Sequence, residues 1–144
     1  MTESTASTVN QAEHRAKLFG NDVVTVRYQI PDVKRAIAFY TRRLGFTLEM
    51  HVGNVFAAVS LGNLRLILSG PGSSGARPMP DGREQGPGGW NRILICVEDL
   101  EGRIESLKAD GVTFRNTIET GRGGSQILIE DPDGNLIELH QPET

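Results

Sequence analysis

The chain has 144 residues, 38% of them hydrophobic, and this length suits one compact body rather than two large independent domains. Its 15 basic and 18 acidic residues give a net charge of −3 and are interspersed, so no basic face is expected to bind nucleic acid. The single cysteine, Cys96, excludes an internal disulfide, and no stretch is apolar and long enough to resemble a signal peptide or a membrane span. A cytoplasmic protein without nucleic-acid or membrane partners is therefore expected.

The first periodic pattern follows a polar, Ser/Thr-rich stretch at residues 1–20, which we interpret as a flexible tail ahead of one domain at 21–142. Hydrophobic residues then alternate with Thr25, Arg27 and Gln29, as in a half-buried strand. Asp32 is an expected N-cap for a helix with hydrophobic residues at helical spacing, and Gly45 is its expected end.

Three more strands are predicted at residues 46–52, 55–61 and 64–68, the last two joined by a Gly62-Asn63 turn. They complete a β-α-β-β-β module at residues 21–70. Residues 69–90 hold many glycines and prolines without a hydrophobic period, which indicates a linker loop.

The same order of elements is repeated at residues 90–142. A strand begins near Arg92, Asp99 is the expected cap of a second helix that ends at Gly111, and strands are predicted at 112–116, 125–130 and 136–140. The offset between the copies is about 70 residues, which is the size of a small half-domain. We therefore predict an α+β fold, in which tandem βαβββ modules form a cup-shaped, partly open mixed β-sheet with helices on its outer face.

The concave face of this sheet is the expected binding site for a small organic ligand. Strand alternation predicts that both polar and apolar side chains line it: Thr25, Arg27, Gln29, Leu66, Arg92, Leu94, Glu138 and His140. Phe56 and Trp90 are candidates for stacking on a planar ligand, although Trp90 also suits an anchor for the glycine-rich loop.

Several segments carry a family resemblance: IPDVKRAIAFYTRRLGF in the first module, and VEDL, LKADGVTF and DPDGNLIEL in the second. With them, residues 23–141 resemble the vicinal oxygen chelate superfamily, which includes glyoxalases, bleomycin resistance proteins and extradiol dioxygenases. The resemblance implies paired modules around a metal or ligand pocket, and members commonly pair such modules within or between chains. Since each βαβββ sheet also leaves a face and an edge to cover, we expect a homodimer.

The resemblance also implies four metal-ligand positions, which correspond here to Thr25, Leu66, Arg92 and Glu138. Only Glu138 is a plausible ligand, since leucine cannot bind a metal and arginine brings positive charge. Because three of the four implied positions lack a good ligand, we predict that the protein has no metal cofactor. The alternative is a rearranged site in which Glu138 and His140 bind Zn, Ni, Fe or Mn. His140 can also be interpreted as an ordinary histidine at the end of a strand, without a metal.

Glu138 is the candidate catalytic residue, and Arg92 is its expected ion-pair partner if both face the cup. An exposed Arg92 at the strand start is the competing interpretation. The leading functional hypothesis is a metal-independent small-molecule-binding protein. The alternatives are a lyase, isomerase or dioxygenase that uses Glu138 as a metal ligand or as an acid and base, and a scaffold module without a small ligand.

Overall fold

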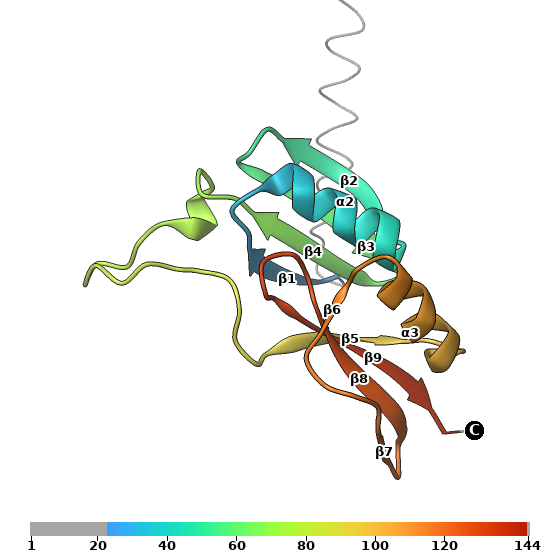
Figure 1. Ribbon diagram of the computed structural model, residues 1–144. Coiled ribbons are helices and arrows are strands. Elements are labelled where there is room, and N and C mark those ends of the chain that lie inside the picture. Colours follow the sequence, from blue (N-terminus) through green and yellow to red (C-terminus); the bar gives the residue numbers. More distant parts are fainter. Residues whose placement is uncertain (1–22, 144) are drawn as a thin grey trace, which may run out of the picture.

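The computed structural model describes residues 23–143, so the predicted tail at 1–20 lies outside the described residues. The first module contains β1 (Val24–Gln29), α2 (Val33–Leu44), β2 (Thr47–Val52), β3 (Phe56–Leu61) and β4 (Leu64–Ser69). Its strands form one mixed sheet in the order β1-β4-β3-β2, in which β1 runs parallel to β4 and the other pairs are antiparallel. Figure 1 shows α2 lying across this sheet.

The ends of α2 are those expected from the sequence. The side chain of Asp32 accepts a hydrogen bond of 3.1 Å from the backbone N–H of Arg35, which satisfies a donor in the first turn. Gly45 has a φ of 76°, the left-handed conformation that a glycine adopts without strain at a helix end. The helix therefore begins and ends where its local chemistry dictates.

The second module contains β5 (Arg92–Cys96), α3 (Leu100–Ala109), β6 (Thr113–Phe114), β7 (Glu119–Gly121), β8 (Gly124–Glu130) and β9 (Leu136–Pro142). Its strand order is β5-β9-β8-β6, with β7 paired to β8 and β5 parallel to β9. The prediction of an α+β fold with two βαβββ modules and mixed sheets is confirmed. Hydrogen bonding keeps the strands in two sheets, one for each module.

One predicted strand is shorter than expected, and β7 was not predicted. The expected strand at 112–116 is reduced to the two residues of β6. The side chain of Asn116 accepts a 2.8 Å hydrogen bond from the N–H of Leu128, a position at which a longer strand would offer a backbone carbonyl. The chain then turns back through Gly121 and Gly124 and adds β7 to the sheet as a short hairpin.

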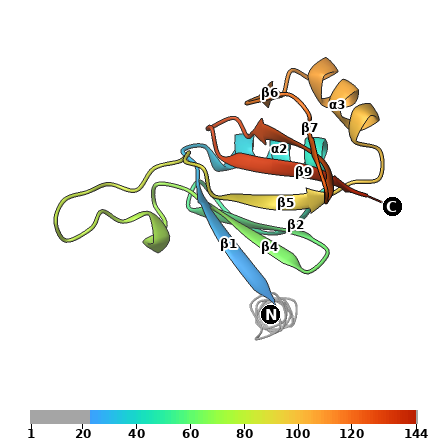
Figure 2. The ribbon, with the colours of Figure 1, turned by 90° about the horizontal axis from the view of Figure 1, so that it is seen from below.

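The loop between the modules, residues 70–91, contains the 3-10 helix η1 (Ser74–Ala76) and extends away from both sheets (Figure 2). No helix within residues 23–143 combines the length and the apolar character needed to cross a membrane.

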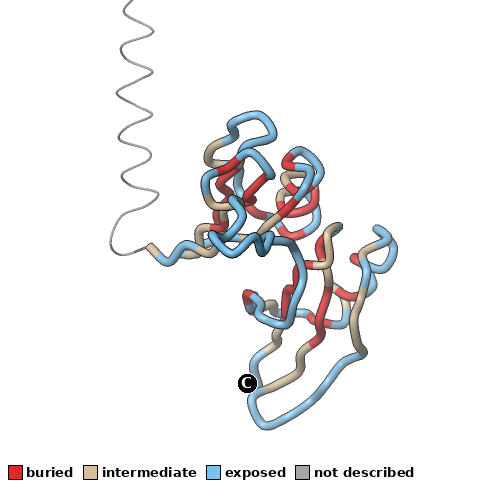
Figure 3. Tube along the Cα trace, turned by 90° about the vertical axis from the view of Figure 1, so that its left-hand side faces the viewer, coloured by how far each residue is buried: buried red, intermediate tan, exposed pale blue. Residues whose placement is uncertain are grey.

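The two modules share one hydrophobic core. One buried cluster includes Val59 and Leu68 from the first sheet, Ile129 and Leu139 from the second, and Tyr40 from α2. In Figure 3 the buried residues concentrate in the helices and central strands, and the connecting loops are exposed. Because each sheet turns its hydrophobic face toward this core, the polar face of each sheet lies on the opposite side.

A buried polar contact between the modules is made by Asp131, of which only 3% is exposed. Its Oδ2 accepts hydrogen bonds of 2.9 Å from the hydroxyl of Tyr40 and from Nδ2 of Asn135. Its Oδ1 accepts from the N–H groups of Asp133 and Asn135, at 2.8 and 2.9 Å. Burial, reinforced by the negative charge of Asp131, raises the pKa of Tyr40 well above its usual value, so the hydroxyl stays a donor.

We predict that Tyr40→Phe lowers the free energy of unfolding by about 2 kcal/mol, because a buried carboxylate then loses one of its donors. Urea denaturation measures this change. Thr41→Val on the same helix is the control, since the Thr41 hydroxyl bonds only within α2, to the carbonyl of Ile37. Equal stability of Tyr40→Phe and the parent protein would contradict this role for Asp131.

Candidate ligand-binding site

The polar face of the second sheet contains an ion pair between Arg92 and Glu138. Nε and Nη2 of Arg92 lie 3.0 and 2.9 Å from Oε1 of Glu138. Parallel pairing places Leu94 opposite Glu138, so Arg92 and Glu138 are diagonal neighbours on one face of β5 and β9. The Glu138 side chain is only 8% exposed, against 31% for Arg92. The guanidinium therefore stabilises the charge of an almost buried carboxylate, as expected from the sequence.

His140 adjoins this pair from the same strand face. Its Nε2 lies 3.2 Å from the carbonyl oxygen of Gly123, and since a carbonyl only accepts, Nε2 carries the proton in this contact. Its Nδ1 is 3.6 Å from Oε2 of Glu138 and is buried without a hydrogen-bond partner. Leu94, which is 50% exposed, adds an apolar surface to this face. The face thus combines a cation, a carboxylate, an imidazole and an apolar contact.

In the first sheet the structure corrects the prediction for Leu66. Pairing of β1 with β4 places Leu66 opposite Val26, whereas Thr25 lies opposite Arg65. Leu66 is fully buried in the shared core and so cannot line a ligand site. The polar face of β4 instead presents Arg65, Ile67 and Ser69.

Arg65 is a residue of the polar face that sequence reasoning missed. Its Nη1 donates to the carbonyls of Gly62 and Leu64, at 2.6 and 3.1 Å, and its Nε is buried without a partner. Only the register between β1 and β4 reveals that Arg65 and Thr25 share a face.

Arg27 and Gln29 face away from the core as predicted, but both bind the long loop. Arg27 Nη1 donates to the hydroxyl of Ser69 at 3.1 Å, and a Cβ added to Gly75 would lie 2.0 Å from that nitrogen. Gln29 Nε2 donates to the carbonyl of Gly75 and to Oε1 of Gln85, at 2.9 and 3.0 Å. Their polar groups therefore hold the loop against the end of β1.

The two aromatic candidates lie in different surroundings. Phe56 is half-buried and pairs with Ser69 on the polar face of the first sheet. Trp90 is 68% exposed and stacks against Arg115, whose Cζ lies 4.7 Å from the ring centroid. Arg115 Nη1 also donates to the carbonyl of Gly89 at 2.8 Å, so the end of the loop is held to the second module. This contact favours the anchor interpretation of Trp90.

The side chains at the implied metal positions do not fit a transition metal. Thr25 is a weak ligand, neither Arg65 nor Ile67 on β4 can bind a cation, and Glu138 is already held by the guanidinium of Arg92. Within residues 23–143, no cluster of three or more His, Cys, Asp or Glu side chains is placed to hold a metal ion. Glu138 and His140 supply only two donors.

A double-mutant cycle tests the ion pair. We predict that Glu138→Gln and Arg92→Leu each lower the free energy of unfolding. The loss in the double variant should be smaller than the sum of the two single losses by about 1 kcal/mol or more, because the double variant leaves no unpaired charge at this site. Chemical denaturation of the four proteins gives the coupling. Arg92→Leu combined with Glu119→Gln, an exposed glutamate on β7, should be additive. Additive losses for Arg92 and Glu138 would refute their pairing.

Comparison with known proteins places this fold in a family. The family model of the Glyoxalase/Bleomycin resistance protein/Dioxygenase superfamily matches residues 22–139. A bleomycin resistance protein of Geobacillus stearothermophilus is 29% identical over 120 residues, which cover 78% of this chain and 90% of that protein. A lactoylglutathione lyase of Pseudomonas putida is 29% identical over 140 residues, which cover 79% of this chain and 81% of that protein. The crystal structure of a superfamily member from Sphaerobacter thermophilus DSM 20745 matches with a TM-score of 0.67 and 27% sequence identity. The match covers 83% of this chain and 95% of that chain. The chain belongs to the glyoxalase/bleomycin resistance protein/dioxygenase superfamily.

Proposed function

We propose that this protein is a metal-independent binding protein that holds a small organic ligand on the polar face of β5 and β9. The observation that carries this proposal is the Arg92–Glu138 ion pair, which occupies implied metal-ligand positions with a guanidinium and its carboxylate. A guanidinium is a fixed cation with five N–H donors, so it supplies positive charge without a metal.

The chemistry of this face suggests which ligand groups it binds. Arg92 directs Nε and Nη2 to Glu138, which leaves the Nη1 donors available for an oxygen of the ligand. Leu94 beside the ion pair offers apolar contact surface. A ligand with an acceptor oxygen next to an apolar or aromatic body satisfies both.

We further propose that the functional form is a homodimer. The polar faces lie on the side of the sheets away from the shared core, whereas a small-molecule site buries most of its ligand. A second copy related by two-fold symmetry would cover one such face with another. The apolar side chains of Leu94 and Val52, 50% and 45% exposed, support a contact at these faces.

An enzyme remains the second candidate, because one oxygen of Glu138 is free of the guanidinium. Oε2 lies 3.6 Å from Nδ1 of His140, so a carboxylate and an imidazole adjoin at the same point. Such a pair suits proton transfer to or from a bound ligand. The relative named lactoylglutathione lyase is consistent with an activity of this class.

The binding proposal predicts that the purified protein carries no stoichiometric Zn, Ni, Fe or Mn, as measured by elemental analysis. A thermal-shift screen of small oxygen-bearing aromatic compounds should find ligands that raise the Tm by mass action. Arg92→Leu should abolish that rise, whereas Arg122→Leu, an exposed arginine in the β7–β8 turn, should retain it. One tightly bound metal ion per chain, lost in Glu138→Ala, would overturn the proposal and favour the enzyme.

The homodimer predicts a light-scattering mass of twice the 15.7 kDa chain. Leu94→Glu should shift the mass to that of a monomer, because it places a charge in the proposed contact. Ile118→Glu is the matched control, since Ile118 is an exposed apolar residue that belongs to neither β5 nor β9. A monomer of the parent protein at tens of micromolar, on the order of typical assay concentrations, would refute the dimer.

A further inference from the structure

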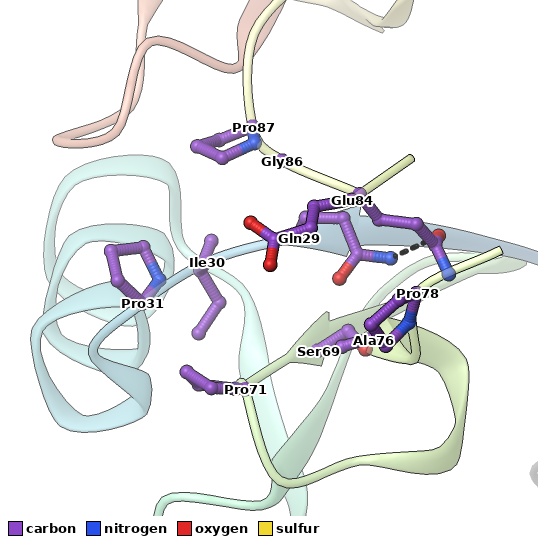
Figure 4. A pocket seen from close by; sticks show the side chains of 11 residues that line it. Gln29, Ile30, Pro31, Ser69, Pro71, Ala76, Pro78, Glu84, Gly86 and Pro87 are labelled. Atoms are coloured by element: carbon purple, nitrogen blue, oxygen red, sulfur yellow. Dashed lines mark hydrogen bonds between the residues drawn. The ribbon is translucent and has the colours of Figure 1, made fainter. Parts of the chain in front are cut away.

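A pocket lies where the end of β1 meets the long loop, and its volume is about 330 Å³ (Figure 4). Its lining includes none of the residues of the Arg92–Glu138 face, so it is distinct from that face. This volume is within the range of small-ligand sites. The pocket is therefore a second candidate site that the proposed function does not use.

The walls of the pocket are apolar and rich in proline. Ile30 and four prolines contribute to the lining: Pro31, Pro71, Pro78 and Pro87. Proline has a fixed φ and no backbone N–H, so these positions are restricted in backbone conformation and lack backbone hydrogen-bond donors. The loop is held in this shape by Gln29, which binds Gly75 and Gln85, and by Gln85 Nε2, which donates to the carbonyl of Arg77 at 3.0 Å. A pocket formed in advance loses little entropy when it binds a ligand.

The polar side-chain groups left for a ligand are mainly acceptors, together with the second N–H of the Gln85 amide, whose first N–H donates to Arg77. The carbonyl of Gly75 can only accept, so the side-chain atom of Gln29 that bonds to it is the amide nitrogen. Both hydrogens of that nitrogen are donated, to Gly75 and Gln85, so the amide oxygen of Gln29 is available to a ligand. The hydroxyl of Ser69 accepts from Arg27 and bonds to Ser73. In Figure 4 the carboxylate of Glu84 extends over the pocket on the side of Ile30. Glu84 has no ion-pair partner within residues 23–143.

We infer that this pocket binds a small organic cation, a primary ammonium carried by an apolar group. The apolar group contacts the proline-rich walls, and the ammonium donates to the carboxylate of Glu84 and the amide oxygen of Gln29. An ammonium has three donors and no acceptor, which complements the acceptor oxygens of Gln29 and Glu84. A carboxylate ligand of the same shape would be repelled by Glu84, and a neutral alcohol would lack the charge.

Nitrogen-15 NMR titration of the full chain with three compounds of similar shape tests this inference: phenethylamine, phenethyl alcohol and hydrocinnamate. The amine should shift the amide signals around Ile30, Ala76 and Glu84, and should bind about two- to fivefold more tightly than the alcohol, as expected for a solvent-exposed charge contact. Hydrocinnamate should bind more weakly than both. Equal affinity for amine and alcohol, or shifts confined to residues outside the pocket, would overturn the inference.

Two variants separate the charge contact from the apolar walls. Glu84→Gln should remove the preference for the amine over the alcohol. Glu105→Gln, which removes the charge of an exposed glutamate on α3, should keep it. Ala76→Leu places extra side-chain volume in the pocket and should weaken amine and alcohol alike. An unchanged preference in Glu84→Gln would show that the carboxylate does not hold the ammonium.

Discussion

The buried carboxylate of Asp131 links the two modules, which also share one hydrophobic core. A carboxylate that is 3% exposed would strongly destabilise the fold unless donors surround it. Two of its four donors are backbone N–H groups of its own turn and one is the side chain of Asn135, but the fourth is Tyr40 on α2 of the other module. Tyr28 adds a related contact, since its hydroxyl donates to the carbonyl of Leu136 and accepts from the N–H of Ile93. These bonds connect the two modules whose hydrophobic faces form the shared core.

The polar faces follow from this arrangement. Since both sheets bury their hydrophobic residues in one core, Thr25 on β1 and Glu138 on β9 belong to faces that the core does not cover. Glu138 is nevertheless almost buried, because Arg92 lies across it. An ion pair of this kind contributes modestly to stability, but it fixes the orientation of the guanidinium. The chain keeps the fold of its superfamily and carries an arginine–glutamate ion pair on this face.

Contacts with the long loop also determine which hydrogen-bonding groups of β1 are available to a ligand. Gln29 uses its two donors, and Arg27 its Nη1, to hold the loop at the end of β1. What remains on the inner side of the loop is a wall of proline rings with the acceptors of Gln29 and Glu84. Structural use of the donors thus determines which ligand chemistry the loop pocket suits.

Local chemistry in the sequence was sufficient for the N-caps Asp32 and Asp99 and for the duplicated order of the modules, because each depends on neighbouring residues or on strand alternation. The contact between Arg92 and Glu138 required the register between β5 and β9, which strand alternation does not give. The face of Leu66 required the tertiary structure. Leu64, Leu66, Leu68 and Ile67 give β4 hydrophobic residues on both faces, so only its register with β1 decides which side is buried. The hydrogen bonds that hold Arg27 and Gln29 against the long loop likewise required the tertiary structure, because the sequence of this loop has no periodic pattern. Contacts between segments distant in sequence arise from packing, and packing is what periodicity alone does not encode.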